Sequence, residues 1–287
     1  MWKNLRLEGC AILAETIINN NGIVYGVTYA DDFKSAHYIR IETPDELDKI
    51  KGSKYIYADK KLNNGKFAYI SAVDDLKEGK LVLFTGLGCD IAALEKTATL
   101  RNAPTENLYT VDLICHGPTF PAVQSSYICE LEERAHSKVV GYNARDKQKG
   151  WSTPCVHVVF ANGHEISKPL YETDFGFALK YYARKSCYNC KFKGVNHIAD
   201  ITIGDYWGLT PKMKGYNKYG VSIFLIRSDK GKRLIKMVNT NHFLFGEANL
   251  SLAIRHNPMY ANSAKKAIFY DKFDEDFKQN GLSYAVS

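Results

Sequence analysis

The apolar positions of this chain change their spacing repeatedly, and each change predicts a new element. Side chains that repeat at helical intervals indicate helices, and short β-branched runs bounded by Gly, Asn or Asp indicate strands. The predicted helices cover residues 9–20, 43–52, 67–79, 89–97, 121–135, 172–184 and 229–238. The predicted strands cover residues 22–29, 37–42, 54–58, 80–86, 108–115, 201–208 and 221–228, with a hairpin over 155–167 that turns at Asn162 and Gly163.

Strands and helices alternate over about residues 50–115, which is the pattern of a parallel sheet flanked by helices. We therefore expect an α/β fold: a mixed, partly parallel sheet flanked by helices, with a hairpin and a cysteine-bearing insertion. The chain has no internal repeat and no evident linker, so a single domain over residues 1–287 is the simplest prediction. Residues 239–287 are mixed and Asn-rich, and form a C-terminal extension without a clear pattern.

Charge and composition narrow the classes of partner. The chain has 38 Lys and Arg against 31 Asp and Glu, a net charge of +7, and the basic residues are spread in small groups. This excludes a dedicated nucleic-acid arm and suits an acidic protein partner or an anionic ligand. No run of eighteen apolar residues predicts a membrane span, and the start does not resemble a secretory signal. The seven cysteines favour a reducing, cytoplasmic location, and nothing in the sequence indicates an oligomeric state.

Four cysteines stand where a ligand site is expected. Cys89 and Cys115 each follow a predicted strand, and ligands in open α/β sheets gather at the carboxyl ends of strands. Cys187 and Cys190 form a CxxC pair in a basic loop after the helix 172–184. Four soft ligands that converge on one point suit a zinc ion or an iron–sulfur cluster. The spacing alone leaves a metal site and ordinary free thiols equally open.

The alternatives differ in what they require. A zinc site usually has a second closely spaced cysteine pair, which is absent, and a thioredoxin-like dithiol should open a helix after a strand. An iron–sulfur site accepts dispersed cysteines. The other three cysteines lie in or at the start of apolar elements, where core packing is the expected role; they are Cys10, Cys129 and Cys155.

Several other residues near predicted strand ends could contact a ligand. Thr85, Gly86 and Gly88 link a strand to a helix, so this turn could either meet a phosphate or simply be tight. His116 similarly follows a strand and could bond a ligand or close its turn. Asp200 and Asp205 flank a β-branched segment, and buried carboxylates there need partners.

Taken together, the sequence resembles the beta-subunit family of coenzyme F420 hydrogenases and dehydrogenases. The resemblance covers about residues 9–230. Over this range the order of the matching stretches, their spacing and the positions of the cysteines agree with the family pattern. It rests on NGIVYGVTY (21–29), GSKYIYAD (52–59), GKLVLFTGLGCDIAAL (79–94), TVDLICHGP (110–118), NARDKQKGW (143–151), SCYNCKFKG (186–194) and ADITIGDYWG (199–208).

The resemblance implies a flavoprotein with FAD and a [4Fe-4S] cluster. Its implied cluster ligands are Cys89, Cys115, Cys187 and Cys190. Its implied flavin-lining residues are Ser53, Lys54, Thr85, Gly86, Asp200, Thr202, Gly204 and Asp205. Lys54 is expected to meet a pyrophosphate, and Thr85 and Gly86 the edge of a ring. No general acid is assigned, and the candidates are His116, Tyr188 and Asp205.

Three stretches depart from the family pattern. Many members have Ser-Gly-Gly where this chain has residues 7–10, and Thr-Pro-Cys-Gln where it has Leu-Gly-Cys-Asp at 87–90. Tyr57 stands where a Gln is expected. Each change falls where the resemblance implies a flavin contact, and Asp90 would place a negative charge near an electron-rich cofactor.

The resemblance thus implies an oxidoreductase that takes electrons from a ferredoxin-like donor and passes them through the cluster and FAD to a small-molecule acceptor. The acceptor would be a deazaflavin or another organic substrate, as in surface-polysaccharide metabolism. The family's frequent ferredoxin module is missing from the sequence, so the donor is expected to be a separate, acidic protein. The departures support an alternative, a non-catalytic partner protein that keeps the fold and the cluster but not the flavin. A zinc-stabilised binding domain is the third interpretation.

Overall fold

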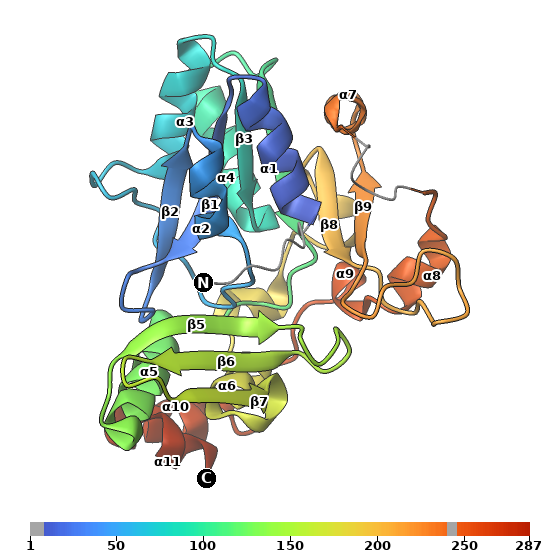
Figure 1. The fold of residues 1–287 in the computed structure, drawn as a ribbon. Coiled ribbons are helices and arrows are strands. Elements are labelled where there is room, and N and C mark those ends of the chain that lie inside the picture. Colours follow the sequence, from blue (N-terminus) through green and yellow to red (C-terminus); the bar gives the residue numbers. More distant parts are fainter. Residues whose placement is uncertain (1–8, 240–245) are drawn as a thin grey trace.

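Two β-sheets, one above the other in Figure 1, form the framework of the chain. The computed structural model describes residues 9–239 and 246–287. The larger sheet has the order β2-β1-β3-β4-β8-β9. Its central strands are parallel, and the two edge strands β2 and β9 are antiparallel to their neighbours. The strands are β1 (Ile23–Tyr29), β2 (Ala36–Ile41), β3 (Val82–Gly86), β4 (Leu108–Leu113), β8 (Ile201–Asp205) and β9 (Ser222–Ile226).

Helices cover both faces of this sheet because alternate residues of its buried strands point to opposite sides. Val24 and Leu83 pack with α1 (Gly9–Asn19), α2 (Leu47–Ile50) and α7 (Asp229–Met237). Tyr25 and Phe84, the next residue in each strand, pack on the other face with α3 (Ala68–Lys77) and α4 (Gly88–Leu100). The four parallel strands therefore all end at one edge of a fully covered sheet.

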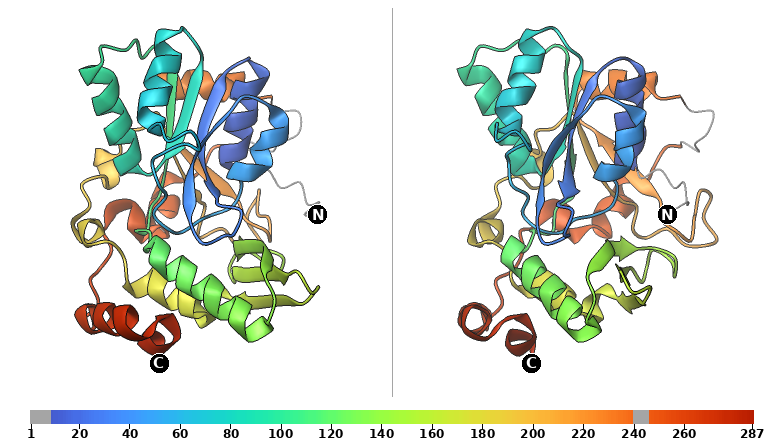
Figure 2. Two further views of the ribbon diagram at one scale, coloured as in Figure 1. Left: turned by 90° about the vertical axis from the view of Figure 1, so that its left-hand side faces the viewer. Right: turned by 60° about the vertical axis from the view of Figure 1, so that its left-hand side comes forward.

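The smaller sheet lies beyond the carboxyl ends of these strands (Figures 1 and 2). It is antiparallel, with the order β5-β6-β7, and its helices bury a separate core against it. The elements are β5 (Val139–Asp146), β6 (Cys155–Phe160), β7 (Glu165–Pro169), α5 (Pro121–Ala135), α6 (Asp174–Tyr181), α10 (Tyr270–Asn280) and α11 (Leu282–Val286). The shorter helices are η1 (Pro44–Glu46), η2 (Leu170–Glu172), η3 (Lys185–Asn189), η4 (Gly194–Asn196), α8 (Leu250–Arg255) and α9 (Pro258–Ala261).

The structure confirms the expected α/β class with a mixed sheet, and it corrects two elements. The strand predicted over 54–58 does not form, because Tyr55 has a left-handed backbone (φ 57°) and only an isolated bridge joins Ile56 to Thr119. Strand β5 is an element that the sequence pattern misses, because irregularities in its pairing with β6 interrupt the alternation of apolar residues. The prediction of one domain over 1–287 includes residues outside the described ranges and stays a prediction.

Within residues 9–239 and 246–287, no helix has the length and apolar character needed to cross a bilayer.

Candidate functional site

The carboxyl ends of β3, β4 and β8 face the smaller sheet (Figure 1). The cysteines predicted as ligands lie in the segments that follow β3 and β4 and in the loop after α6. Cys89 is the second residue of α4, and Cys115 lies two residues beyond the end of β4. Because β3 and β4 are adjacent and parallel, their ends bring these two segments to the same edge. The order of strands along the sequence is therefore enough to place these two cysteines near each other.

The CxxC pair reaches the same edge through the loop after α6. Cys187 lies in η3, and Cys190 follows directly after it. Gly117, two residues after Cys115, has a φ of 90°, and a Cβ built on it would lie only 3.2 Å from the Cβ of Cys187. A Cβ on Gly88, next to Cys89, would similarly lie 2.8 Å from the Cβ of Phe192 in the same loop. The loop thus packs tightly against both strand ends.

The thiols influence one another electrostatically. Burial raises the pKa of the Cys115 thiol to about 12, and the thiols of Cys89 and Cys187 raise it further. The backbone N–H of Gly117, which donates to the Cys115 sulfur at 3.3 Å, and the Lys193 ammonium act in the opposite direction. Burial followed by the thiol of Cys190 raises the pKa of Cys187, although Arg184 lowers it. Each of the four sulfurs is therefore within electrostatic range of another.

Hydrogen bonds from later parts of the chain fix the cysteine loop. The backbone N–H of Cys190 donates to the Ser263 hydroxyl at 3.0 Å, and the Lys193 ammonium donates to the carbonyls of Cys115 and Met259. Arg227 donates to the carbonyl oxygens of Gly194 and His197, at 2.9 and 3.1 Å. The loop is thus held at its second cysteine and over the residues that follow it.

These residues fit an iron–sulfur cluster by the chemistry of their donor set, which is four thiols from three converging segments. No three His, Cys, Asp or Glu side chains in the described ranges lie close enough together to bind a single metal ion. The cysteine sulfurs around a four-iron cluster lie farther apart than those around one ion, because the cluster separates them. Of the other cysteines, Cys155 is buried in β6, whereas Cys10 and Cys129 are half-buried.

Several of the residues expected to line a flavin already bond protein groups, although the buried hydroxyl of Thr202 has no hydrogen-bond partner among the described residues. The Lys54 ammonium, expected at a pyrophosphate, donates to the carbonyls of Lys51 and Gly52, at 2.6 and 3.1 Å, just beyond the end of α2. The side chain of Ser53 hydrogen-bonds that of Tyr55. The Thr85 hydroxyl donates to the carbonyl of Tyr25 at 2.9 Å.

The stretch from Asp200 to Asp205 spans the whole of β8, from the amino end of the strand to its carboxyl end. Asp200 lies at the amino end, where its carboxylate accepts from the backbone N–H and the hydroxyl of Thr110, at 2.9 and 3.0 Å. It is a structural residue, away from the cysteines. Thr202 is fully buried, and a Cβ on Gly204 would collide with Ile114 at 2.6 Å. Only Asp205 reaches the carboxyl edge.

The three candidates for proton transfer have different surroundings. Asp205 forms an ion pair with Arg145 of β5. The Tyr188 hydroxyl accepts from the backbone N–H of Ala183 at 3.1 Å, so it holds η3 against the end of α6. His116 is exposed at the surface, yet partial desolvation, followed by the nearby Lys193 and Arg145, lowers the pKa of its imidazole. Of the three, His116 alone has a side chain open to solvent.

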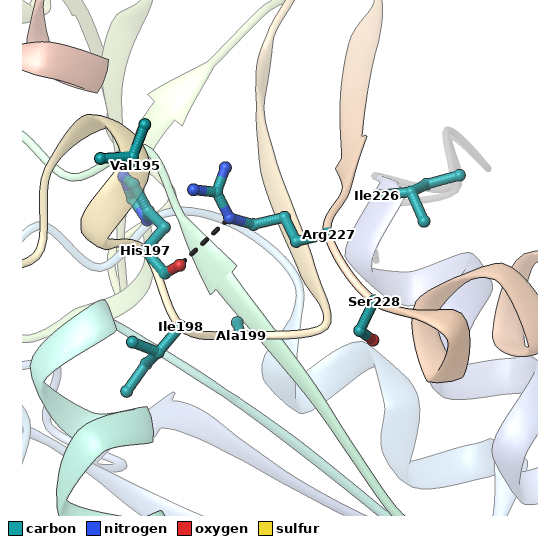
Figure 3. A pocket seen from close by; sticks show the side chains of 7 residues that line it. All are labelled: Val195, His197, Ile198, Ala199, Ile226, Arg227 and Ser228. Carbon is teal, nitrogen blue, oxygen red and sulfur yellow. Dashed lines mark hydrogen bonds between the residues drawn. The ribbon is translucent and has the colours of Figure 1, made fainter.

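Sequence reasoning missed a buried pair beneath the site. His197 Nδ1 lies 2.6 Å from an Asp112 carboxylate oxygen, and the two side chains are 2% and 0% exposed. The imidazole also stacks on the ring of Tyr260. His197 lines an open pocket of about 370 Å³ with Val195, Arg227 and neighbouring residues (Figure 3), and this pocket includes none of the expected flavin residues. The order of the two residues along the chain gave no signal that they meet.

Comparisons with known proteins agree with this architecture. The family model for the C terminus of the coenzyme F420 hydrogenase/dehydrogenase beta subunit matches residues 79–248. A chain in the solved F420-reducing [NiFe] hydrogenase complex from Methanosarcina barkeri, a xenon derivative, has a similar fold. Its TM-score is 0.56 at 18% identity, over 94% of this chain and 85% of that chain. A comparison with curated proteins gave no significant match. The matched segment contains all four candidate cysteines, and the chain belongs to the family defined by the C terminus of coenzyme F420 hydrogenase/dehydrogenase beta subunits.

Proposed function

We propose that this chain is an iron–sulfur electron-transfer protein, in which Cys89, Cys115, Cys187 and Cys190 hold a [4Fe-4S] cluster. The observation that carries the proposal is the convergence of these four thiols from three segments at the carboxyl edge of the sheet. Membership of a family of redox subunits supports the same chemistry.

The surrounding residues suit a centre that gains negative charge. When bound, a [4Fe-4S] cluster supplies one-electron redox chemistry. The Gly117 N–H already points at the Cys115 sulfur, and Lys193 lies close to it. Burial and the carboxylate of Asp90 raise the pKa of the Cys89 thiol to about 11, and the cations of Lys60 and Arg184 partly oppose that rise. Donors and cations around ligand sulfurs favour the more negative state of such a centre and raise its reduction potential.

The partner we propose is an external, acidic, ferredoxin-like donor. Cys89 is exposed, and Lys185 and Lys191 are exposed on the cysteine loop. Together with the net charge of +7, this surface favours an acidic protein. The cluster would pass electrons on one at a time, so reduction of a small organic acceptor such as a deazaflavin, which takes a hydride, would need a two-electron carrier such as a flavin on a partner protein. A reducing compartment such as the cytoplasm suits the thiols.

The proposal contains no hydride transfer through FAD. Three of the side chains expected to bind that cofactor, those of Lys54, Thr85 and Asp200, already bond protein groups. The four cysteines and the donors around them favour the role of an electron-transferring partner protein over that of a self-sufficient flavoenzyme.

Anaerobic reconstitution tests the proposal directly. We expect about four irons and four sulfides per chain, and a large loss of both when Cys187 or Cys115 is replaced by Ser. Cys129→Ser, a half-buried cysteine of α5, is the matched control and should retain the iron. A protein that takes up no iron, or whose Cys187→Ser variant keeps its full iron content, would contradict the assignment. Zinc without iron would favour the zinc-stabilised domain.

A further inference from the structure

We propose that Asp90 and Lys60 form an internal ion pair that closes the β3–α4 turn to anionic cofactors, so that this chain rejects FAD. The inference concerns which ligand the turn accepts, and it does not depend on the presence of the cluster. In an open sheet such a turn is normally the natural place for a phosphate, because the first N–H groups of the helix point outward.

Asp90 takes the place that an anion would occupy. It is the third residue of α4, and its carboxylate accepts from the backbone N–H of Leu87 at 3.2 Å. The hydroxyls of Tyr69 and Tyr38 donate to the same carboxylate at 3.0 and 3.2 Å. The residue is 3% exposed. A buried carboxylate thus already satisfies the positive end of the helix.

Lys60 neutralises this carboxylate and cannot serve a second anion. Its ammonium lies 2.8 Å from Asp90 Oδ1, and the residue is 9% exposed. It also lies over the ring of Tyr57, 4.3 Å from the ring centroid. The guanidinium of Arg184 lies 4.0 Å from the centroid of that ring. The ring of Tyr57 therefore contacts two cations that could otherwise face a phosphate.

Protein side chains pack closely against the glycines of the turn. A Cβ on Gly86 would lie 2.5 Å from the Tyr38 hydroxyl and 3.0 Å from Asp90 Cβ. A Cβ on Gly88 would lie 2.8 Å from Phe192 and 3.2 Å from the carboxylate of Asp112. The small residues thus accommodate protein side chains on both sides. Asp112, itself paired with His197, places a second carboxylate at the start of the helix.

Two of the departures from the family pattern meet in this network. Tyr57 and Asp90 stand where the resemblance leads us to expect glutamines, and Lys60 contacts both of them. Two substitutions that are 33 residues apart in sequence are therefore linked in space through Lys60. A pyrophosphate brought to this turn would meet a buried carboxylate before it met a free cation.

A flavin-binding titration of this chain tests the inference. We expect no saturable change in FAD fluorescence with the wild-type protein up to about 100 μM, and a gain of at least about tenfold in affinity for Asp90→Asn. Asparagine keeps the bond from the Leu87 N–H while it releases Lys60. Tyr57→Gln, a change at a half-buried side chain, should shift affinity in the same direction, and it decides the matter if Asp90→Asn does not fold.

Two further variants make the result specific. In Asp90→Asn combined with Lys60→Met, the gain should disappear, because the released cation is what binds the pyrophosphate. Glu106→Gln, at an exposed acid near the opposite edge of the sheet, should leave FAD affinity unchanged. Saturable FAD binding by the wild type would overturn the inference. So would unchanged affinity in both single variants, or a double variant that binds as well as Asp90→Asn. Iron content is measured separately, so failure of the cluster proposal would be distinguishable.

Discussion

The guanidinium of Arg145 in β5 lies 2.5 Å from the carboxylate of Asp205 at the end of β8, and this ion pair joins the two sheets. The side chains are only 14% and 17% exposed. Arg145 also donates to the Tyr55 hydroxyl at 3.2 Å and lies over the ring of Trp207. One side chain therefore links the smaller sheet to the carboxyl edge where the cysteines gather.

Replacing Arg145 by Met should lower the free energy of unfolding by about 2–4 kcal/mol, because it leaves a largely buried carboxylate with only Lys147 at 4.0 Å. Urea denaturation of Arg145→Met, Asp205→Asn and the double variant measures the coupling. The double variant should lose less than the sum of the single losses. Additive losses would show that the pair does not act as a unit.

The buried pair beneath the site leads to a second prediction. His197→Phe keeps a ring to stack on Tyr260 but leaves the Asp112 carboxylate buried without its partner, which should cost about 3–5 kcal/mol. Adding Asp112→Leu should restore much of that stability, because no unpaired charge remains. Thermal denaturation compares the variants, with His164→Phe at an exposed turn as the control. A double variant no more stable than His197→Phe would contradict the explanation.

A third prediction concerns acid stability. Burial tends to raise the pKa of Asp75, but hydrogen bonds from Arg40, Tyr25 and Lys80 outweigh it and lower the pKa. A carboxyl whose pKa is lowered by folding adds stability above its unfolded pKa of about 3.9, and that stability is lost as the pH falls through the folded pKa.

Between about pH 5 and about pH 2, a window that spans the unfolded pKa and extends below it, the urea midpoint of the wild type should therefore fall more steeply than that of Asp75→Asn. The two curves should converge as the wild-type carboxyl becomes protonated. Parallel curves throughout the range would mean that Asp75 does not contribute to the loss. Asp31→Asn, at an exposed turn, is the control.

The C-terminal helices should contribute strongly to stability although they lie beyond the segment that the family model matches. Phe273 of α10 is 3% exposed and packs with Tyr182 in the core of the smaller sheet. Phe273→Ala should cost about 3–5 kcal/mol in a denaturant titration. Phe67→Ala, at a side chain that is 45% exposed, should cost far less. Equal losses would show that α10 adds little to the core.

The sequence predicts those parts of the fold that follow from local spacing. The helix over 121–135 has the predicted bounds, and apolar runs reveal the strands that carry Cys89 and Cys115 to one edge. Strand β5 and the left-handed Tyr55 escape such reasoning, because bulges and backbone reversals depend on tertiary pairing. Contacts such as Lys60 with Asp90 join distant positions, and no local pattern encodes them.

The hydrogen bonds between the cysteine loop and later residues bear on when a metal can be inserted during synthesis of the chain. Ser263 bonds the backbone of Cys190, Met259 accepts from Lys193, and the carboxylate of Asp274 accepts from Tyr182 at the end of α6. These partners leave the ribosome well after the last of the four cysteines. All four thiols of the nascent chain are therefore synthesised before the residues that hold the cysteine loop in place. A metal inserted before those later residues are synthesised would bind a loop that they do not yet hold.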